Sequence, residues 1–320
     1  MTLRAGVIGM GVMGKHHCRV LNELEGVEFV GVMDPLAPQD SVAFPVLPDF
    51  DEFLRLDLDY CVVAAPTSLH HKIGTDLASL GIHALIEKPI AETVEQASLL
   101  EGAFAEAGLV GAVGHIERYN PAIVEMRKHI DDGLIGEVYQ IATRRQGPFP
   151  GRIADVGVVK DLATHDIHLA LWLSSSNFSH FTGHVTHQAG RPYEDMLVAV
   201  GKLDSGTITS HVVNWLSPFK ERLTIVTGER GTLVANTLSV ELSYHANGQQ
   251  TSIWEQLATF RGVSVGDTTH YAINQYEPLQ LEHECFRDAL LSGDSSGIVS
   301  LAEGRRVLEV TEQVRPLNGL

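Results

Sequence analysis

Gly9-Met10-Gly11-Val12-Met13-Gly14 follows the apolar run Ala5-Gly6-Val7-Ile8 and opens a segment, 12–24, whose pattern predicts a helix. Between a strand and a helix, a G-x-G-x-x-G sequence has a physical role. The first glycine permits a tight turn, the second lets a pyrophosphate approach the backbone, and the third lets helix and strand pack closely. The helix N-terminus adds unpaired N–H groups and the positive end of its dipole. We therefore expect all six residues to bind a dinucleotide, the alternative being a glycine-rich turn without a ligand.

An acidic residue about 20 positions further on, at the end of the second strand, completes the dinucleotide-binding pattern. Val27–Met33 is predicted to be that strand, and Asp34 follows it directly. Asp34 is therefore expected to contact the adenosine ribose. The next residues, Pro35-Leu36-Ala37, include no basic side chain, which favours NAD over NADP.

The first 115 residues alternate between strand and helix patterns. Apolar or β-branched runs lie at Tyr60–Ala65, His83–Glu87 and Val110–Gly114, with helical spacing at Leu69–Leu80 and Val94–Ala107 between them. This alternation predicts a parallel sheet with helices on both faces. The predicted fold class is α/β, with a doubly wound Rossmann domain over residues 1–115.

The pattern changes in residues 116–320, for which we expect a second α+β domain with a large open sheet. From Phe178 to Tyr244, strand patterns alternate with turn signals, which is typical of a mainly antiparallel sheet. The turn signals are Asp204-Ser205-Gly206, Gly228-Glu229-Arg230-Gly231 and Asn247-Gly248. Helices are expected at Pro121–Asp131, Asp161–Leu173, Tyr276–Ser292 and Ser300–Arg315, and a strand at Glu137–Arg145. A substrate is expected to bind between the two domains.

Composition narrows the possible partners and compartment. With 23 basic and 40 acidic residues, the net charge is -17, which argues against nucleic acid or an anionic membrane as partner. The sequence holds no apolar run of about 18 residues and no basic-then-apolar start, so neither a membrane span nor export is expected. Cys18, Cys61 and Cys285 are scattered, which is typical of reduced, packed thiols in a cytoplasmic protein.

Three polar residues are candidates for acid–base chemistry. Lys88 lies just beyond the strand His83–Glu87, on the carboxyl edge where doubly wound sheets bind ligands. Asp161 and His165 are spaced i, i+4 on the expected helix, so the carboxylate can orient the imidazole as a general base. His168 lies at i+7 on the same face. The alternatives are a solvated lysine, a helix N-cap at Asp161 with a packed histidine, or a metal site made of Asp161, His165 and His168.

Two further clusters are candidates for substrate binding. Arg144, Arg145 and Arg152 surround a Pro-rich turn, and strand alternation places the first two on opposite faces, so one of them is able to hold a phosphate. The alternative is a solvated sheet face. The segment that joins the domains is dense in polar groups, and its candidate residues are His115, Glu117, Tyr119 and Asn120. Asn120-Pro121 also fits a simple helix start.

Taken together, five of these motifs resemble the Gfo/Idh/MocA family. They are Gly9–Gly14, Asp34, Ala65-Pro66-Thr67 with His70, Glu87-Lys88-Pro89 and Asp161…His165. The resemblance implies NAD(P)-dependent oxidation or reduction of sugars and cyclitols, and an open sheet that mediates a homodimer or homotetramer. Lys88, Asp161 and His165 match the catalytic residues of the family. The residues carried over to cofactor binding are Ala65, Pro66, Thr67, His70, Glu87 and Lys88. The resemblance also implies a cis Lys88–Pro89 bond, whereas His168 stands where the family usually has Asp.

A narrower likeness is to the UDP-N-acetylglucosamine 3-dehydrogenase branch, carried by residues 114–121, 144–150 and 155–159. It implies an NAD-dependent enzyme that oxidises a secondary hydroxyl of a UDP-linked N-acetylamino sugar. His165 or Lys88 would then act as the base, with no metal. The alternatives are an inositol or free-sugar dehydrogenase, in which the three arginines are structural, and a cofactor-binding protein with a silent site.

Overall fold

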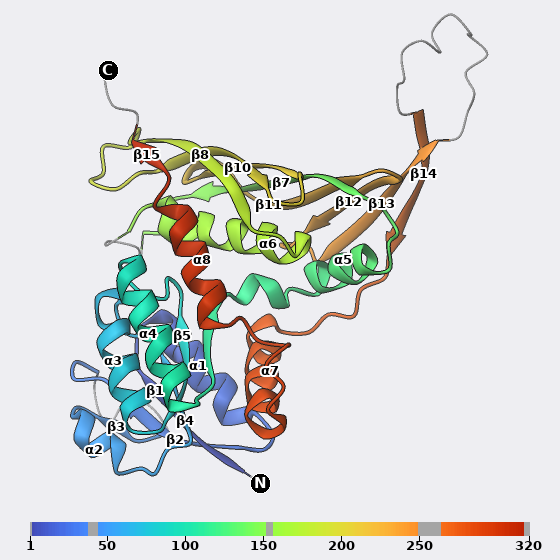
Figure 1. The fold of residues 1–320 in the computed structure, drawn as a ribbon. Coiled ribbons are helices and arrows are strands. Elements are labelled where there is room, and N and C mark those ends of the chain that lie inside the picture. Colours follow the sequence, from blue (N-terminus) through green and yellow to red (C-terminus); the bar gives the residue numbers. More distant parts are fainter. Residues whose placement is uncertain (1, 38–43, 152–155, 249–263, 317–320) are drawn as a thin grey trace, which may run out of the picture. The chain divides into compact units, whose positions relative to one another are not determined.

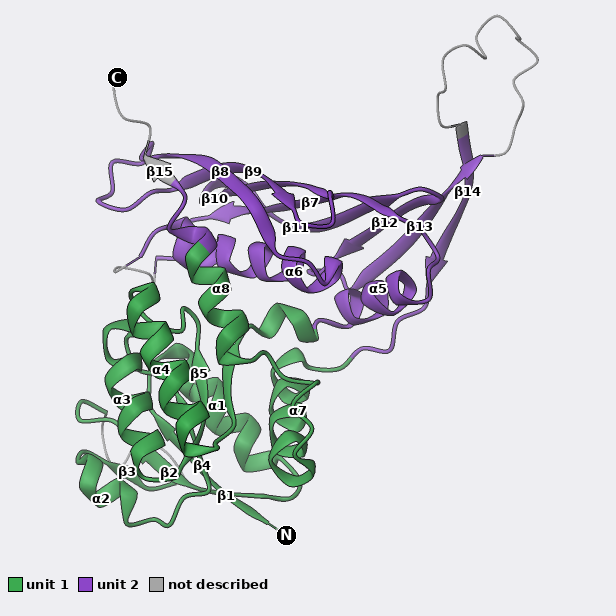
Figure 2. Cartoon of the chain, viewed as in Figure 1, with its two compact units in different colours: residues 1–119, 276–309 green, residues 120–275, 310–320 purple. Residues whose placement is uncertain are grey.

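The computed structural model describes residues 2–37, 44–151, 156–248 and 264–316 (Figure 1). The chain forms two compact units (Figure 2). Unit 1 comprises Met1–Tyr119 with Tyr276–Glu309, and unit 2 comprises Asn120–Gln275 with Val310–Leu320.

Unit 1 contains the predicted parallel sheet, sheet A, whose strand order is β3-β2-β1-β4-β5-β6 with every neighbouring pair parallel. This is the order of a doubly wound dinucleotide-binding fold. Its elements are β1 (Leu3–Ile8), α1 (Val12–Glu23), β2 (Val27–Met33), β3 (Val46–Leu47), α2 (Phe50–Leu54), β4 (Tyr60–Val63), α3 (Thr67–Ser79), β5 (His83–Glu87), α4 (Val94–Ala107), β6 (Gly111–Gly114) and the 3-10 helix η1 (Ile116–Tyr119). The short β3 and α2 were not predicted, since neither is long enough to show a period.

The two C-terminal helices, α7 (Pro278–Ser292) and α8 (Leu301–Thr311), differ from the expected division of the chain. Both were expected in the second domain, but α7 and all of α8 up to Glu309 belong to unit 1. The reason is packing: Phe286 joins the apolar cluster of Val7 and Tyr60 on one face of sheet A, and Leu301 joins the cluster of Ile86 on the other.

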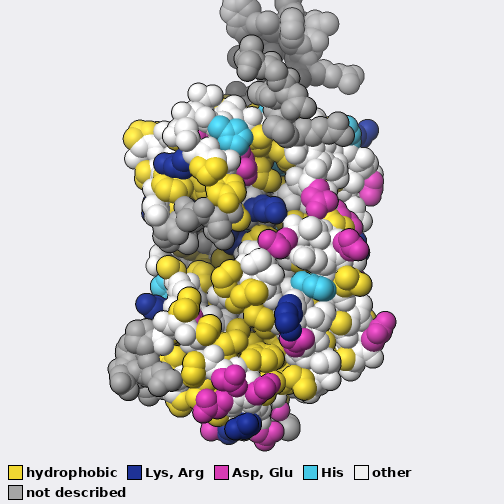
Figure 3. Space-filling view, turned by 90° about the vertical axis from the view of Figure 1, so that its left-hand side faces the viewer, with side chains coloured by type: hydrophobic (Ala, Val, Ile, Leu, Met, Phe, Trp, Pro, Cys, Tyr) yellow, Lys and Arg dark blue, Asp and Glu magenta, His cyan; other side chains and the backbone are white. Residues whose placement is uncertain are grey.

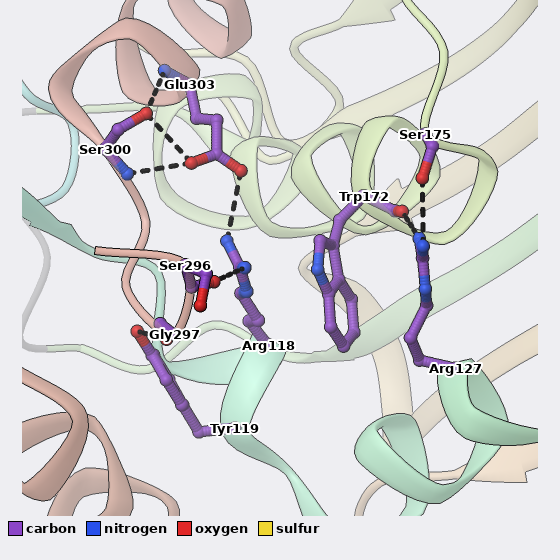
Figure 4. Close-up of polar contacts among 9 residues, drawn as sticks. All are labelled: Arg118, Tyr119, Arg127, Trp172, Ser175, Ser296, Gly297, Ser300 and Glu303. Carbon is purple, nitrogen blue, oxygen red and sulfur yellow. Dashed lines mark hydrogen bonds and ion pairs between the residues drawn. The ribbon is translucent and has the colours of Figure 1, made fainter. Parts of the chain in front are cut away.

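The start of α8 is fixed by a capping box, which also anchors η1 (Figure 4). Ser300 Oγ accepts from the Glu303 N–H at 3.2 Å, and Glu303 Oε2 accepts from the Ser300 N–H at 2.8 Å. The other Glu303 oxygen accepts from Arg118 Nη1 at 3.0 Å, and Tyr119 Oη donates to the Gly297 carbonyl at 3.3 Å.

Unit 2 is built on a nine-stranded sheet, sheet B, with the order β14-β13-β12-β11-β7-β10-β9-β8-β15. It is mainly antiparallel, as predicted, with parallel pairs only at β7–β10 and β8–β15 among the described strands. Its elements are α5 (Pro121–Asp131), β7 (Val138–Pro148), the π-helix η2 (Val159–Ala163), α6 (Thr164–Ser174), β8 (Phe178–Thr186), β9 (Met196–Leu203), β10 (Ile208–Asn214), β11 (Leu216–Gly228), β12 (Gly231–Asn236), β13 (Glu241–Gly248), β14 (Ser264–Tyr271) and β15 (Arg315–Pro316).

Helices α5 and α6 lie along one face of sheet B (Figure 1). Buried side chains of both helices share one apolar cluster with the strands, for example Ile123, Leu169 and Val226. Arg127 of α5 donates to the Trp172 carbonyl and, at 2.9 Å, to Ser175 Oγ, which satisfies the C-terminal end of α6 (Figure 4).

Two local predictions for unit 2 are wrong. Asn247-Gly248 does not form a turn, because β13 continues through both residues, which pair with Val265 and Ser264 of β14. The expected helix Asp161–Leu173 is not a single α-helix, because its first residues belong to the π-helix η2.

On the face drawn in Figure 3, acidic side chains gather at the lower end, around a basic side chain. None of the helices in the described part of the chain has the length and apolar character that crossing a bilayer requires.

Candidate active site

The glycine-rich turn of unit 1 has the geometry that a pyrophosphate cradle needs. Gly9 has a φ of +101°, and a Cβ there would lie 2.5 Å from the Ala64 carbonyl oxygen. A Cβ on Gly14 would lie 2.0 Å from the Gly9 carbonyl oxygen, whereas a Cβ on Gly11 would meet nothing within 4 Å in the described chain. The first and third glycines are thus required by packing, and the second leaves an open approach to the N-terminus of α1. These residues fit the diphosphate of a dinucleotide.

Asp34 ties this turn to the end of β2. Its Oδ2 accepts from the Met10 N–H at 2.7 Å, and its Oδ1 accepts from the N–H groups of Leu36 at 2.8 Å and Ala37 at 3.2 Å. The carboxylate therefore lies beside the turn, as the dinucleotide-binding pattern requires. Its contact with ribose remains a prediction.

His70 joins the loops that follow β4 and β5. The ring is buried, with Nδ1 2.9 Å from the Pro89 carbonyl oxygen and Nε2 2.8 Å from the Ala65 carbonyl oxygen. Burial lowers the pKa of His70. The side chain thus spans two backbone segments at the carboxyl edge of sheet A, and Pro66 is the N-cap of α3, which starts at Thr67. The predicted contacts of these residues with the cofactor stay predictions.

Lys88 follows β5 at the same edge, and the Lys88–Pro89 bond is cis. The preceding carboxylate, Glu87, accepts from the Lys88 N–H at 3.1 Å and lies 2.9 Å from His17 Nε2 of α1. Burial raises the pKa of Glu87, but the hydrogen bond with His17 and the electrostatic interactions with His17 and Lys88 outweigh it, so the net pKa is lowered. The edge therefore carries an ionised carboxylate next to the candidate catalytic lysine.

The segment after β6 brings one more predicted residue to this region. His115 is buried, and its pKa is lowered to about 3 by burial and then by the charge of Lys88. Glu117 is half-buried in η1, whereas Tyr119 is engaged with Gly297. Asn120 caps α5, since its side chain accepts from the Ala122 N–H at 3.1 Å and donates to the Thr237 carbonyl at 3.1 Å. The helix-start alternative is therefore confirmed for Asn120.

In unit 2, Asp161 lies in the π-helix and His165 lies in the first turn of α6. Asp161 is half-buried, and His165 and His168 are buried. The two N-caps of this stretch are Val158 and Ala163, so the N-cap alternative for Asp161 is wrong. Single π-helical turns next to or within α-helices are frequent at functional sites. Across the described ranges, no group of three or more His, Cys, Asp or Glu side chains is arranged to hold a metal ion.

Glu194 fixes the start of the π-helix and was missed by sequence reasoning. Its Oε1 accepts from the Val159 N–H at 3.1 Å, and its carbonyl accepts from the Val158 N–H at 3.0 Å. A Cβ on Gly157 would lie 2.1 Å from the Glu194 carboxyl carbon, so a larger residue there would displace the Glu194 carboxylate.

The arginines lie on opposite faces of β7, as alternation predicts. Arg145 is buried and its Nε donates to both oxygens of Asp166 at 3.1 Å, with side chains 5% and 2% exposed. Arg144 is on the open face and pairs with Glu221 at 3.5 Å. Arg152 lies outside the described residues. Phosphate binding by any of the three stays a prediction.

His17 and His283 are two buried polar residues of unit 1 that were not predicted from the sequence. Each lies among the buried positions of its helix, His17 with Gly14 and Leu21 in α1, and His283 with Phe286 in α7. In α1 the available signal was a histidine among small and apolar buried positions, whereas in α7 the buried face also carries Glu282.

Two family models match this chain. A model described as "Oxidoreductase family, NAD-binding Rossmann fold" matches residues 3–115, and the Gfo/Idh/MocA C-terminal domain matches residues 123–234.

The relatives include sugar and inositol dehydrogenases. UDP-N-acetylglucosamine 3-dehydrogenase of Acidithiobacillus ferrooxidans is 32% identical over 54% of this chain, and the match spans 55% of that relative, about half its length. scyllo-Inositol 2-dehydrogenase (NAD(+)) of Bacillus subtilis is 26% identical, with 74% of each chain covered. A solved structure of the Acidithiobacillus enzyme superposes with a TM-score of 0.86 at 26% identity, covering 98% of this chain and 97% of that one.

The N-terminal family model thus matches residues of unit 1, and the C-terminal family model matches residues of unit 2. With its parallel NAD-binding sheet and its open C-terminal sheet, this chain belongs to the Gfo/Idh/MocA oxidoreductase family.

Proposed function

We propose that the protein is an NAD-dependent dehydrogenase that oxidises a secondary hydroxyl of a UDP-linked N-acetylamino sugar. The observation that carries this proposal is the carboxyl edge of sheet A, where the open Gly11 backbone, the Asp34 carboxylate and Lys88 next to an ionised Glu87 lie together on one unit. A dinucleotide cradle with a lysine at the same edge suits hydride transfer from an alcohol. The likeness to UDP-N-acetylglucosamine 3-dehydrogenase supports the substrate class.

In this proposal the chain's own residues handle the hydroxyl proton. NAD, when bound, supplies the hydride acceptor at carbon 4 of its nicotinamide. His165, oriented by Asp161, accepts the proton of the substrate hydroxyl, and Lys88 donates a hydrogen bond to the developing alkoxide. His165 and Lys88 are able to exchange these roles. No metal takes part.

The alternative is an inositol or free-sugar dehydrogenase, and one observation favours it. Arg145 is held by Asp166 inside unit 2, and Arg144 is paired with Glu221. Two of the three arginines assigned to a substrate diphosphate thus have structural partners. scyllo-Inositol 2-dehydrogenase (NAD(+)) is also among the relatives.

The test is NADH production against a panel of UDP-sugars, inositols and free hexoses, with Lys88→Ala as the inactive control. The proposal expects the highest kcat/KM for a UDP-linked N-acetylamino sugar. It further expects Arg152→Ala to raise KM for that substrate more than it lowers kcat, because the diphosphate is remote from the reacting carbon. A much higher kcat/KM for an inositol than for every UDP-sugar would replace this proposal by the polyol alternative.

A further inference from the structure

Arg191 lies in the loop between β8 and β9 of unit 2, at the end of sheet B where β7 also ends. Its guanidinium lies over the ring of Phe149, with Cζ 3.4 Å from the ring centroid. At this distance the guanidinium must lie nearly flat on the ring, because a tilted group would bring a nitrogen into repulsive contact with it. Phe149 in turn meets Trp215 edge to face, with centroids 5.2 Å apart. Arg191 is therefore held on an aromatic pair.

One nitrogen of Arg191 lacks an acceptor. Nη1 is buried and has no hydrogen-bond partner among the described residues. A buried donor of a charged group lowers stability when it is left unpaired, so native proteins nearly always pair such donors with protein, water or a ligand. The N–H groups of a guanidinium lie in its plane and form a fork that fits two anionic oxygens. The group on Phe149 is thus arranged to receive an anion.

The acidic side chains closest to Arg191 along the chain have other partners. Asp195 is 0% exposed, and its two oxygens accept from backbone N–H groups of the same loop. The Asp195 carbonyl also accepts from the Trp215 N–H at 2.9 Å. Glu194 Oε1 accepts from the Val159 N–H at 3.1 Å. The loop is therefore fixed by its own carboxylates.

Arg127 of α5 serves as an internal comparison, because it also lies over an aromatic ring. Its Cζ is 5.5 Å from the ring centroid of Trp172. All three of its nitrogens donate to the protein: Nε to Asp131 at 2.8 Å, Nη2 to Ser175 Oγ at 2.9 Å, and Nη1 to the Trp172 carbonyl (Figure 4). Arg127 is thus a structural arginine. Arg191 has the ring but no acceptor for Nη1 in the described chain.

The loop of Arg191 is joined to the stretch that carries the acid–base residues of unit 2. Glu194, three residues after Arg191, holds the N–H of Val159 in the π-helix η2. Asp161 belongs to that π-helix, and His165 follows in the first turn of α6. The same loop therefore fixes the start of η2 and presents Arg191, which places Arg191 to bind a substrate whose hydroxyl reacts at His165.

We propose that Arg191 is a substrate-binding residue that holds the diphosphate of the nucleotide sugar, with Phe149 keeping its guanidinium in place. This inference rests on the proposed function, which supplies the diphosphate. Arg144 and Arg145 are each paired with a carboxylate of the protein, whereas Nη1 of Arg191 is not. With a net charge of -17, the chain repels anions as a whole, so a bound diphosphate requires a local cation of this kind.

The test is calorimetric titration of the intact protein saturated with NADH, so that the probe cannot occupy the glycine-rich turn. The probes are UDP and uridine, which differ by the diphosphate. The wild type should bind UDP at least about tenfold more tightly than uridine, and Arg191→Gln should lower that ratio by about tenfold or more, the effect of losing charged hydrogen bonds. Arg191→Lys keeps the charge without the fork and should restore part of the ratio. Lys202→Gln, an exposed cation at the other end of β9, is the control and should leave the ratio unchanged.

Equal affinity of the wild type for UDP and uridine, or no binding of UDP, overturns the proposal. A wild-type ratio in Arg191→Gln overturns it as well. If Arg191→Gln fails to fold, Arg191→Met, which keeps an unbranched apolar stem against Phe149, decides by the same criterion. Turnover of a UDP-sugar together with a wild-type ratio in Arg191→Gln would overturn this inference and leave the proposed function standing. UDP binding that depends on Arg191, in an enzyme that oxidises no UDP-sugar, would do the reverse.

Discussion

Lys88 and His165 are the residues whose removal should affect chemistry rather than folding. Lys88 lies at the carboxyl edge of sheet A, and His165 lies in the first turn of α6. We expect Lys88→Ala and His165→Ala each to lower kcat by roughly 10²- to 10⁴-fold, the usual scale of lost acid–base catalysis. NAD affinity, measured by calorimetry, should change little. Lys72→Ala, at an exposed site, is the control. Near wild-type turnover in either variant would show that its assignment is wrong.

Asp34 should decide the choice between NAD and NADP. Its negative charge repels a 2′-phosphate, so NAD should bind more tightly than NADP in the wild type. The structure shows that both carboxylate oxygens also hold backbone N–H groups, including that of Met10 in the glycine-rich turn. Asp34→Asn removes the charge and keeps one acceptor, so it should narrow the gap between the two dissociation constants. Asp34→Ala should weaken the binding of both NAD and NADP.

Calorimetric titration of NAD and NADP checks this expectation, with Asp51→Asn as a control for the loss of an exposed carboxylate. Equal affinity for the two cofactors in the wild type would contradict the role given to Asp34.

At the scale of elements, the Arg145–Asp166 pair joins β7 to α6. Because both side chains are buried, Arg145→Ala removes one member of a buried ion pair, which should lower the free energy of unfolding by about 3–5 kcal/mol. Arg144→Ala, on the open face, should lower the free energy of unfolding by about 1 kcal/mol or less. The double variant Arg145→Met/Asp166→Leu should recover much of the loss.

Urea unfolding followed by tryptophan fluorescence measures this difference, since Trp172 and Trp215 both belong to unit 2. If Arg145→Ala were as stable as Arg144→Ala and bound a UDP-sugar more weakly, Arg145 would be a substrate ligand after all.

His211 on β10 should make the stability of unit 2 depend on pH. Burial lowers its pKa from the ordinary 6.5 to about 4. Below pH 6.5 the unfolded chain binds a proton at His211 that the folded chain does not. The contribution of His211 to the free energy of unfolding is therefore fully present above pH 6.5 and is lost as the pH falls towards 4. The loss from this group should reach about 2 kcal/mol by pH 5.

The matched variant is His211→Asn, which keeps a polar atom near Thr143 Oγ1, where His211 Nδ1 now lies at 2.8 Å. The free energy of unfolding of His211→Asn should vary less between pH 7 and pH 5 than that of the wild type. Parallel pH curves for the two proteins would exclude His211 as the titrating group.

For the whole molecule, we predict a homo-oligomer that uses the open face of sheet B. On that face Val198, Val200 and Ile208 are each about half exposed, and the register places them in adjacent rows of β9 and β10. Exposed apolar sheet surfaces of this kind are typical of subunit interfaces. Val198→Asp/Val200→Asp should shift the mass measured by light scattering to that of a monomer. Leu36→Asp, at an exposed apolar residue of unit 1, should not. A monomeric wild type would exclude this interface.

Local sequence determined the Rossmann sheet, the pyrophosphate turn and the place of Lys88. Strand and helix periods, the glycine spacing and the acid at Asp34 are short-range constraints on the backbone, so they can be predicted from neighbouring residues. The structure confirms the parallel, doubly wound sheet A and the open side of Gly11. The roles of Asp161 and His165 stay predictions, because acid–base function depends on a substrate and not on helical spacing alone.

Only the tertiary structure decided which polar groups meet. His17 is 70 residues from Glu87 and 266 from His283 along the chain, and neither contact leaves a local pattern. Likewise, the sequence allowed Arg145 to face either a ligand or a carboxylate of the protein. The structure shows that α6 packs on β7 and places Asp166 against Arg145. The packing of α7 on unit 1 could not be predicted from the sequence either, because an apolar helix face has no preferred partner until the sheet that it covers has formed.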